Sequence, residues 1–289
     1  MKLSQKSAAA FTRVLVTGLP GSGKSTLVAK LAERYRLIWI TLDNDADILR
    51  SLPLSQQDNI ELLDIPDSAK FPVAAQTLLS LFSQRKGKIC NIHGVFNCGL
   101  CTKNSPTEFT LVDLTTLTQD DIVVIDTVSQ LGRSVLAHTM KDKSIDTKPE
   151  RDDWGALRKW TEFFASEFQA ARYNLVCIAH VVEAELENGK TKLVPDFGSK
   201  GMSASFAKIF SHVVYCDIVN KKHRAYSSSV ALNEALTKSR TSFRVEDLPE
   251  PSLLPIFDML KGKTDQSPTT PAAKAVVDLQ ALAASMKAR

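Results

Sequence analysis

The residues most able to carry out chemistry lie near the N-terminus, where residues 18–26 read GLPGSGKST and match the G-x-x-x-x-G-K-S pattern of a phosphate-binding loop. An apolar run, VLV, precedes this loop and a helical run follows it, so the loop is expected to join a strand to a helix. The glycines permit a tight turn in which backbone N–H groups surround phosphate oxygens, Lys24 is expected to reach the β and γ phosphates, and Ser25 is expected to hold Mg²⁺. The expected nucleotide contacts are Gly18, Gly21, Ser22, Gly23, Lys24, Ser25 and Thr26. We therefore predict that the chain binds a nucleoside triphosphate.

An acidic residue further along the chain agrees with this prediction. The apolar run IVVI at residues 122–125 ends in Asp126. In P-loop proteins an acidic residue at the end of such a strand lies beside the phosphate loop and orients Mg²⁺. Asp126 is expected to act in this way through water, although many buried strands end in Asp and the residue could instead cap the next helix.

Three of the five cysteines fall in one short stretch that reads C-x2-H-x4-C-x2-C, formed by Cys90, His93, Cys98 and Cys101. Two close pairs of soft ligands, separated by a turn, can converge tetrahedrally, which predicts a closed structural Zn²⁺ site. Three unrelated buried thiols are the alternative, which suits a polar, Gly- and Asn-containing loop less well. The minimum role of this zinc insertion is to staple a loop too small for its own core, and a nucleic-acid contact stays open.

Composition predicts one main α/β domain. The chain has 289 residues, 44% hydrophobic content and a net charge of +4 at pH 7, an excess too small to identify a polyanion partner by itself. Because no segment has the apolar length of a signal peptide or membrane span, we expect a cytoplasmic protein with no membrane partner. We expect an N-terminal arm at residues 1–12, a nucleotide-binding core at 13–248 with the zinc insertion at 85–104, and a flexible Pro-, Ala- and Lys-rich tail at 249–289.

Alternating strand and helix patterns in this core predict a parallel sheet with crossover helices. The expected strands are 13–17, 37–42, 109–114, 122–125, 174–179 and 212–217, and the expected helices are 25–35, 73–84 and 154–171. In the last helix, Leu157, Trp160, Phe164 and Phe168 recur at spacings of three and four, which predicts a buried stripe and not a base-stacking surface.

These motifs, together with three weaker features in the same order, resemble the RecA-like recombinase core over residues 13–244. The weaker features are LDND at 42–45, IAH at 178–180 and KSR at 238–240. The chain is more closely similar to the phage RecA-like single-strand annealing and recombination proteins, which are small AAA-type ATP-binding proteins. The resemblance implies an α/β fold: a RecA-like P-loop NTPase core with a mainly parallel sheet flanked by helices, a small zinc-binding insertion and a flexible C-terminal tail. It implies ATP and Mg²⁺ as cofactors, beside Zn²⁺, and the host cytoplasm as the location of a phage-encoded chain.

The resemblance also implies roles for residues at strand ends. Asp43, with Asp45 as a second candidate, matches the position that polarises the attacking water; the family's recombinases have Glu there, and a helix-capping role stays open. His180 matches a polar sensor of the γ-phosphate, which is typically Gln in recombinases. Lys238 and Arg240 alternate on an expected strand and match a basic pair that reaches the ATP of a neighbouring subunit, with a solvated basic edge strand as the alternative.

The family's DNA-binding loops leave the sheet after the Asp126 and His180 strands, which places them at residues 140–153 and 181–205. The first loop has mixed charge, which does not favour DNA binding. The second combines lysines, glycines and an aromatic residue, which suits single strands with exposed bases, although loops of this length are often simply disordered. Its candidate DNA-binding residues are Lys190, Lys192, Phe197 and Lys200. The basic strip KKHR at 221–224 either extends this path or forms a solvated turn.

The sequence thus predicts an ATP-dependent single-stranded DNA-binding protein acting in homologous recombination or single-strand annealing. The expected assembly is a homo-oligomer, a filament or ring, with ATP at the subunit interface. Hydrolysis is expected to be slow, because Asp43 is shorter than the usual Glu. Two other classes stay open: a P-loop phosphotransferase that uses the zinc insertion as a lid, and a RecA-like regulatory ATPase that binds a protein partner.

Overall fold

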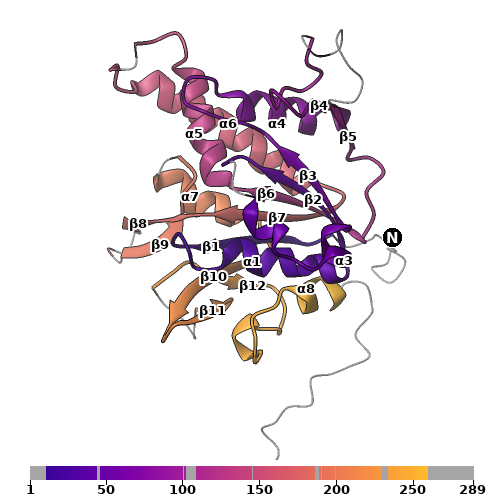
Figure 1. Ribbon diagram of the computed structural model, residues 1–289. Helices are drawn as coiled ribbons and strands as arrows, with labels where there is room; N and C mark the ends of the chain where they lie inside the picture. The colour runs from indigo at the N-terminus through magenta and orange to yellow at the C-terminus, as the bar shows by residue number, and fades with distance from the viewer. Residues whose placement is uncertain are drawn as a thin grey trace, which may run out of the picture.

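A central, mainly parallel sheet organises the chain. The computed structural model describes residues 11–43, 46–99, 101, 109–144, 146–185, 189, 191–198, 200–229 and 234–259. Its eight-stranded sheet has the order β11-β10-β1-β7-β6-β2-β3, with β12 also paired to β10 (Figure 1). Neighbours from β10 to β3 are parallel, whereas β11 and β12 pair with β10 in antiparallel fashion. The strands are β1 (Arg13–Gly18), β2 (Arg36–Thr41), β3 (Ile60–Asp64), β6 (Asp121–Asp126), β7 (Asn174–Ala179), β10 (His212–Val219), β11 (Lys222–Tyr226) and β12 (Lys238–Ser239).

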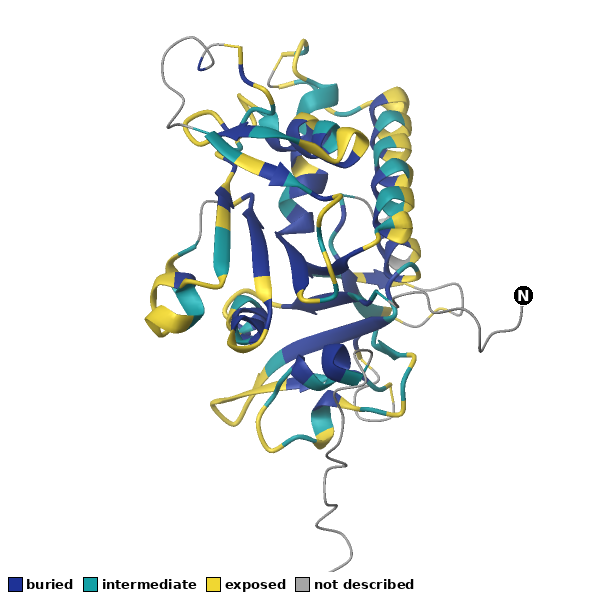
Figure 2. Cartoon of the chain, turned by 90° about the vertical axis from the view of Figure 1, so that its right-hand side faces the viewer, coloured by how far each residue is buried: buried dark blue, intermediate teal, exposed yellow. Residues whose placement is uncertain are grey.

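The composition of the central strands explains their position. Strands β6, DIVVID, and β7, NLVCIA, are buried at every residue. Continuous apolar runs of this kind are typical of parallel strands with helices on both faces. The edge strand β3, IELLD, buries only Leu63 fully. Figure 2 shows the same contrast, with the central strands in dark blue. The expected α/β fold with a mainly parallel sheet is therefore confirmed.

Helices cover both faces of this sheet and enclose two separate hydrophobic clusters. One face carries α1 (Lys24–Ala29) with its 3-10 continuation η2 (Lys30–Glu33), α2 (Asp47–Arg50) and α8 (Leu254–Asp258). The other face carries α4 (Val73–Gln84), α5 (Val128–Thr139), α6 (Arg151–Ala170) and α7 (Lys200–Ala207). The short elements α3 (Leu54–Gln57) and η4 (Val245–Asp247) complete the set of described helices. The helix predicted at 73–84 has the predicted bounds.

The apolar stripe of α6 also agrees with its prediction. Leu157, Phe164 and Phe168 are buried, and Trp160 packs partly buried against the same cluster. Phe82 of α4 meets Phe164 and Phe168 edge to face. These aromatic rings therefore form core and are not exposed to a ligand. Among the helices that the structure describes, none is both long and apolar enough to cross a membrane.

Two hairpins lie off the main sheet. Strands β4 (Lys86–Cys90) and β5 (Phe109–Asp113) pair in antiparallel fashion and carry the cysteine cluster, so the predicted strand at 109–114 belongs to this hairpin instead of the parallel sheet. Strands β8 (Val181–Glu185) and β9 (Thr191–Pro195) form the second hairpin directly after β7. The prediction of a long polar loop at 181–205 is therefore wrong, because this segment forms the hairpin and helix α7.

Both ends of the core extend further than the predicted boundaries. Thr12 is buried and its N–H donates to Asn174 Oδ1 (3.0 Å), so it is part of the core and not of an arm. At the other end, α8 buries Ile256 and Phe257, and Asp258 Oδ1 accepts from the Tyr35 hydroxyl at 2.7 Å. The predicted tail boundary at 249 is therefore too early. The remainder of the predicted tail, 260–289, and the arm residues 1–10 lie outside the described residues.

Candidate nucleotide-binding site

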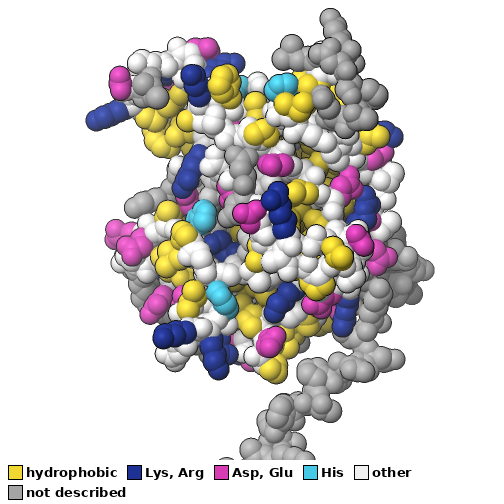
Figure 3. Space-filling model, in the orientation of Figure 1, with side chains coloured by type: hydrophobic (Ala, Val, Ile, Leu, Met, Phe, Trp, Pro, Cys, Tyr) yellow, Lys and Arg dark blue, Asp and Glu magenta, His cyan; other side chains and the backbone are white. Residues whose placement is uncertain are grey.

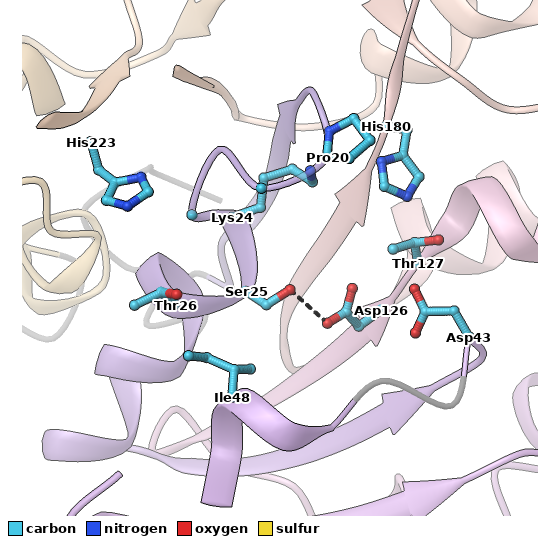
Figure 4. Close-up of a pocket in the computed structure, with 12 residues that line it drawn as sticks. Pro20, Lys24, Ser25, Thr26, Asp43, Ile48, Asp126, Thr127, His180 and His223 are labelled. Atoms are coloured by element: carbon cyan, nitrogen blue, oxygen red, sulfur yellow. Dashed lines mark hydrogen bonds between the residues drawn. The ribbon is translucent and has the colours of Figure 1, made fainter. Parts of the chain in front are cut away.

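The carboxyl ends of four neighbouring strands form the rim of one cleft. Strand β7 lies between β1 and β6, and β2 follows β6. Parallel strands end at the same edge of a sheet, which is where open α/β folds bind ligands. The cleft has a volume of about 530 Å³ and its lining includes the phosphate loop and the residues after the other three strands (Figure 4). The lining residues that were predicted are Gly21, Gly23, Lys24, Ser25, Thr26, Asp43, Asp126 and His180.

The phosphate loop has the backbone shape that its glycines allow. Gly21 and Gly23 have φ values of 75° and 88°, a region that favours glycine, and α1 begins at Lys24. The Lys24 ammonium donates to the carbonyl oxygens of Gly18 (3.1 Å) and Leu19 (2.8 Å), so it lies across the loop where phosphates are expected. Burial lowers the pKa of Lys24, while the negative charges of Asp126 and Asp43 act in the opposite direction.

Ser25 and Asp126 meet beside this loop. The Ser25 hydroxyl donates to Asp126 Oδ2 at 3.0 Å, which joins the start of α1 to the end of β6 (Figure 4). Asp126 is 3% exposed. A hydroxyl and a carboxylate at the edge of a phosphate site are the oxygen donors that Mg²⁺ uses together with phosphates and water. These two residues therefore fit the predicted Mg²⁺ site.

Asp43 faces the same cleft from the end of β2. It is exposed, its Oδ1 accepts from the Thr41 hydroxyl at 3.2 Å, and it lines the cleft on the side of Asp126 (Figure 4). This position suits a carboxylate that acts on a water molecule near the terminal phosphate. The second candidate, Asp45, lies outside the described residues.

His180 follows β7 and is held by its backbone. Its N–H donates to the Ser129 hydroxyl (2.9 Å), and its carbonyl accepts from the Asp196 N–H (2.7 Å). The imidazole lines the cleft, and its Nδ1 is buried without a hydrogen-bond partner among the described residues. Burial lowers the pKa of His180, and the positive charges of Lys24 and Arg133 lower it further. A neutral imidazole with an unused nitrogen is suited to a hydrogen bond with a bound phosphate or water.

A second histidine, His223 of β11, also lines the cleft. Its Nδ1 is 3.1 Å from the Ser22 carbonyl oxygen. The sequence placed His223 only in a basic strip, because no local pattern indicates that β11 pairs with β10 beside the phosphate loop. The one signal in the sequence was that side chains alternate between faces along a strand, so His223 had to point to the opposite face from Lys222 and Arg224.

The predicted basic pair lies elsewhere. Lys238 pairs with Val213 near the start of β10, at the sheet edge opposite to the phosphate loop of the same chain. Its ammonium donates to the carbonyl oxygens of Lys208 (2.9 Å) and Phe210 (2.7 Å), and Arg240 is exposed. Neither side chain lines the cleft of its own subunit, so a role at a neighbour's ATP stays a prediction.

The predicted DNA-binding residues lie in different environments. Phe197 is 0% exposed and stacks on Phe206 with ring centroids 4.2 Å apart, so the prediction that it contacts bases is wrong. Lys192 lies on β9 and Lys200 begins α7, whereas Lys190 lies outside the described residues. In the other expected loop, the Lys143 ammonium donates to Asp153 Oδ2 (2.7 Å) in the first turn of α6, so this segment ties α5 to α6.

The cysteine cluster forms where β4 ends, in the segment that leads from β4 to β5. The ligand atoms of Cys90, His93, Cys98 and Cys101 lie within 4.8 Å of one another. Cys90 Sγ is 3.1 Å from Cys101 Sγ, and His93 Nδ1 is 3.5 Å, 3.9 Å and 3.3 Å from the three sulfurs in chain order. Tetrahedral Zn–S and Zn–N bonds of about 2.3 and 2.0–2.1 Å require separations near these values.

The cluster is anchored on the core. Gly94 follows His93 with φ 64°, its N–H donates to the Cys90 carbonyl (2.8 Å), and its own carbonyl accepts from the Thr77 hydroxyl of α4 (2.7 Å). Hydrogen bonding to Cys90, burial and hydrogen bonding to Cys98 raise the pKa of Cys101 to about 12. The donor set therefore fits a closed metal site.

The strand order, the phosphate loop and the Ser25–Asp126 pair define a RecA-like P-loop ATPase. A family model described as "AAA domain" matches residues 10–241, and the chain belongs to this family. No curated protein matches the sequence significantly.

Solved structures with similar folds have low sequence identity to the chain. A KaiC-like protein from the archaeon Pyrococcus horikoshii OT3 is 15% identical, with 74% of this chain and 76% of that chain covered and a TM-score of 0.37. The RadB recombinase is 12% identical, with 74% and 79% covered and a TM-score of 0.40. An ATPase of a bacterial type III secretion system is 12% identical, with 71% and 51% covered and a TM-score of 0.39.

Proposed function

We propose that this ATPase binds single-stranded DNA in a nucleotide-dependent manner and acts in homologous recombination or single-strand annealing. The observation that carries the proposal is the continuity between the cleft and the β8–β9 hairpin. Residue His180 lines the cleft, and the next residue, Val181, begins the hairpin. A change in the contacts of His180 on nucleotide binding would therefore act directly on the hairpin.

The backbone contacts of His180 support this coupling. Ser129 lies near the start of the helix that follows Asp126, and its hydroxyl donates to the Asp196 carbonyl (2.8 Å) while accepting from the His180 N–H. The segment that follows Asp126 and both ends of the hairpin are thus joined through one side chain. Lys192 on β9 is the described candidate for a phosphate contact.

Two further features complete the proposal. Lys238 and Arg240 lie at the end of the sheet opposite to the cleft of their own subunit, so they can approach only the nucleotide of a neighbouring subunit. A homo-oligomer with ATP at the subunit interface gives them this position. The Cys90–Cys101 cluster binds structural Zn²⁺, which holds together a hairpin whose small size prevents a core of its own. Hydrolysis is slow, in keeping with Asp43 at the position of the catalytic carboxylate.

Fluorescence anisotropy of labelled single-stranded and duplex oligonucleotides tests the function, with ATP, a slowly hydrolysed analogue or no nucleotide over a salt series. We expect nucleotide to tighten single-strand binding by the wild type and by Lys30→Ala, whose side chain lies outside the cleft. Lys24→Ala should lose this response, because a hydrogen-bonded charge contact to phosphate is worth about 1.5–3 kcal/mol.

Absence of nucleotide-responsive binding to either DNA would contradict the proposal. Product analysis with candidate phosphate acceptors would then test the phosphotransferase class. Nucleotide-dependent capture of a protein would test the regulatory ATPase class.

A further inference from the structure

The hairpin formed by β10 and β11, with its turn at residues 220–221, lies against the phosphate loop. The Nδ1 atom of His223 is 3.1 Å from the Ser22 carbonyl oxygen, and an added Cβ on Gly23 would lie 2.8 Å from the same Nδ1. The glycine therefore leaves room for the imidazole as well as shaping the loop. At the start of the loop, Gly18 pairs with Cys216 of β10. The phosphate loop thus contacts the β10–β11 unit at two points.

The hairpin geometry puts His223 and its basic neighbours on different faces. His223 pairs with Ile218, whereas Lys222 pairs with Val219 and Arg224 with Asp217. Side chains alternate along a strand, so the face with His223 meets the phosphate loop while Lys222 and Arg224 point the other way. Two turn residues with positive φ, Asn220 (52°) and Lys221 (62°), make the connection short. A displacement of His223 is therefore expected to move the basic face as well.

The basic face is exposed and carries more positive than negative charges. Lys221, Lys222 and Arg224 are exposed, and Asp217 is the acidic residue paired with Arg224. Lys and Arg side chains, in dark blue, gather at the lower left of Figure 3, the region where Figure 1 draws β11. Three cations on a tight turn fit the evenly spaced charges of a polyphosphate backbone.

We propose that His223 fastens the β10–β11 turn to the phosphate loop, so that nucleotide in the cleft and a polyphosphate backbone on Lys221, Lys222 and Arg224 bind cooperatively. With Nδ1–H donating to the Ser22 carbonyl, the imidazole follows the loop as it closes around phosphates. The choice of single-stranded DNA as the polyphosphate rests on the proposed function. The coupling itself rests on the His223 contact. Because binding linkage is reciprocal, each ligand tightens the other by the same factor.

A linkage measurement tests the coupling. Affinities of an oligo-dT are measured with and without a slowly hydrolysed ATP analogue for the wild type, His223→Ala, His223→Asn and the control Lys159→Ala, an exposed lysine of α6. We expect a linkage factor of roughly 5–150 in the wild type and control, a factor near one in His223→Ala, and partial recovery in His223→Asn, whose amide can still donate. A full linkage factor in folded His223→Ala would overturn the proposal.

The double variant Lys221→Ala/Lys222→Ala tests the surface without touching the cleft. It should weaken oligo-dT binding and lower the salt dependence by about one unit of slope per lost phosphate contact, while nucleotide affinity in the absence of DNA is unchanged. Unchanged oligo-dT affinity would overturn the assignment of this surface.

Amide hydrogen exchange separates this inference from the proposed function. If the wild type binds no oligonucleotide, the proposed function fails, and the exchange rates of residues 217–226 still test the contact. Nucleotide should slow exchange there in the wild type and not in His223→Ala. Equal exchange with and without nucleotide in the wild type would overturn the coupling itself.

Discussion

The backbone N–H of His180 donates to the hydroxyl of Ser129 at 2.9 Å, which joins the end of β7 to the helix that follows Asp126. The same hydroxyl donates to the Asp196 carbonyl at 2.8 Å. Ser129 is 1% exposed, so both backbone groups depend on this side chain for their hydrogen bonds.

Replacement of Ser129 by Ala should therefore destabilise the core. Loss of the hydroxyl leaves a partly buried N–H and a partly buried carbonyl unpaired, and we expect the free energy of unfolding to fall by about 1–3 kcal/mol. Urea unfolding measures the change. Ser80→Ala on α4, where the side chain is only partly buried, is the control and should be nearly neutral. Equal stability of Ser129→Ala and the wild type would mean that water replaces the hydroxyl.

The two carboxylates of the cleft should differ in their kinetic effects. Asp43→Asn is expected to lower kcat by roughly 100-fold or more, with little change in nucleotide affinity, because it removes the proposed base that acts on water. Asp126→Asn should instead weaken Mg²⁺-dependent nucleotide binding, because Asp126 accepts a hydrogen bond from Ser25 and lies at the proposed Mg²⁺ position. Single-turnover hydrolysis and nucleotide titrations with and without Mg²⁺ distinguish them. Identical profiles for the two variants would contradict these separate roles.

The cysteine cluster should contain one zinc ion per chain. Metal analysis of purified protein measures the content directly, and Cys98→Ser should lose the ion, since three remaining ligands no longer close the site. Chelation should increase protease cleavage within the Cys90–Cys101 loop more than elsewhere. Cys177→Ser, a buried strand cysteine outside the cluster, should keep its zinc. Wild-type protein that contains no metal would remove this site.

Stability should fall in acid because of His212. This residue is 3% exposed, and burial together with the charges of Arg240 and Lys238 lowers its pKa to about 4. The lowered pKa means that the folded protein favours the neutral imidazole, whereas the unfolded chain takes up a proton near pH 6.5. The stability that this difference contributes is therefore complete above pH 6.5 and is lost as pH falls towards 4. The loss should amount to about 3 kcal/mol. Thermal unfolding across this range, compared with His212→Gln, measures it, and parallel pH profiles would contradict the assignment.

Helix α8 is part of the ATPase core. Phe257 is 2% exposed, and we expect Phe257→Ala to lower the free energy of unfolding by about 3–5 kcal/mol. Deletion of residues 260–289, which composition predicts to be a flexible segment, is the matched control and should leave unfolding unchanged. A strong effect of the deletion, with none from Phe257→Ala, would reverse this boundary.

Local patterns were sufficient for those features that short stretches of sequence encode. The GLPGSGKST loop, the buried run before Asp126 and the helix at Val73–Gln84 each depend on neighbouring residues, so their spacing identified them. The C-x2-H-x4-C-x2-C stretch is similar, because its four candidate ligands come from a single short segment.

Tertiary structure alone decided the features that depend on distant pairings. The sequence predicts that Phe197 contacts DNA bases, yet it packs on Phe206 in the core. The sequence places His223 only in a basic strip, yet the pairing of β10 with β11 brings it to Ser22. Likewise, α8 belongs to the core because its apolar side chains and Asp258 find partners on η2 and Tyr35. The residues that bury these positions or pair with their charges come from segments far apart in the chain, and local sequence periodicity does not encode such contacts.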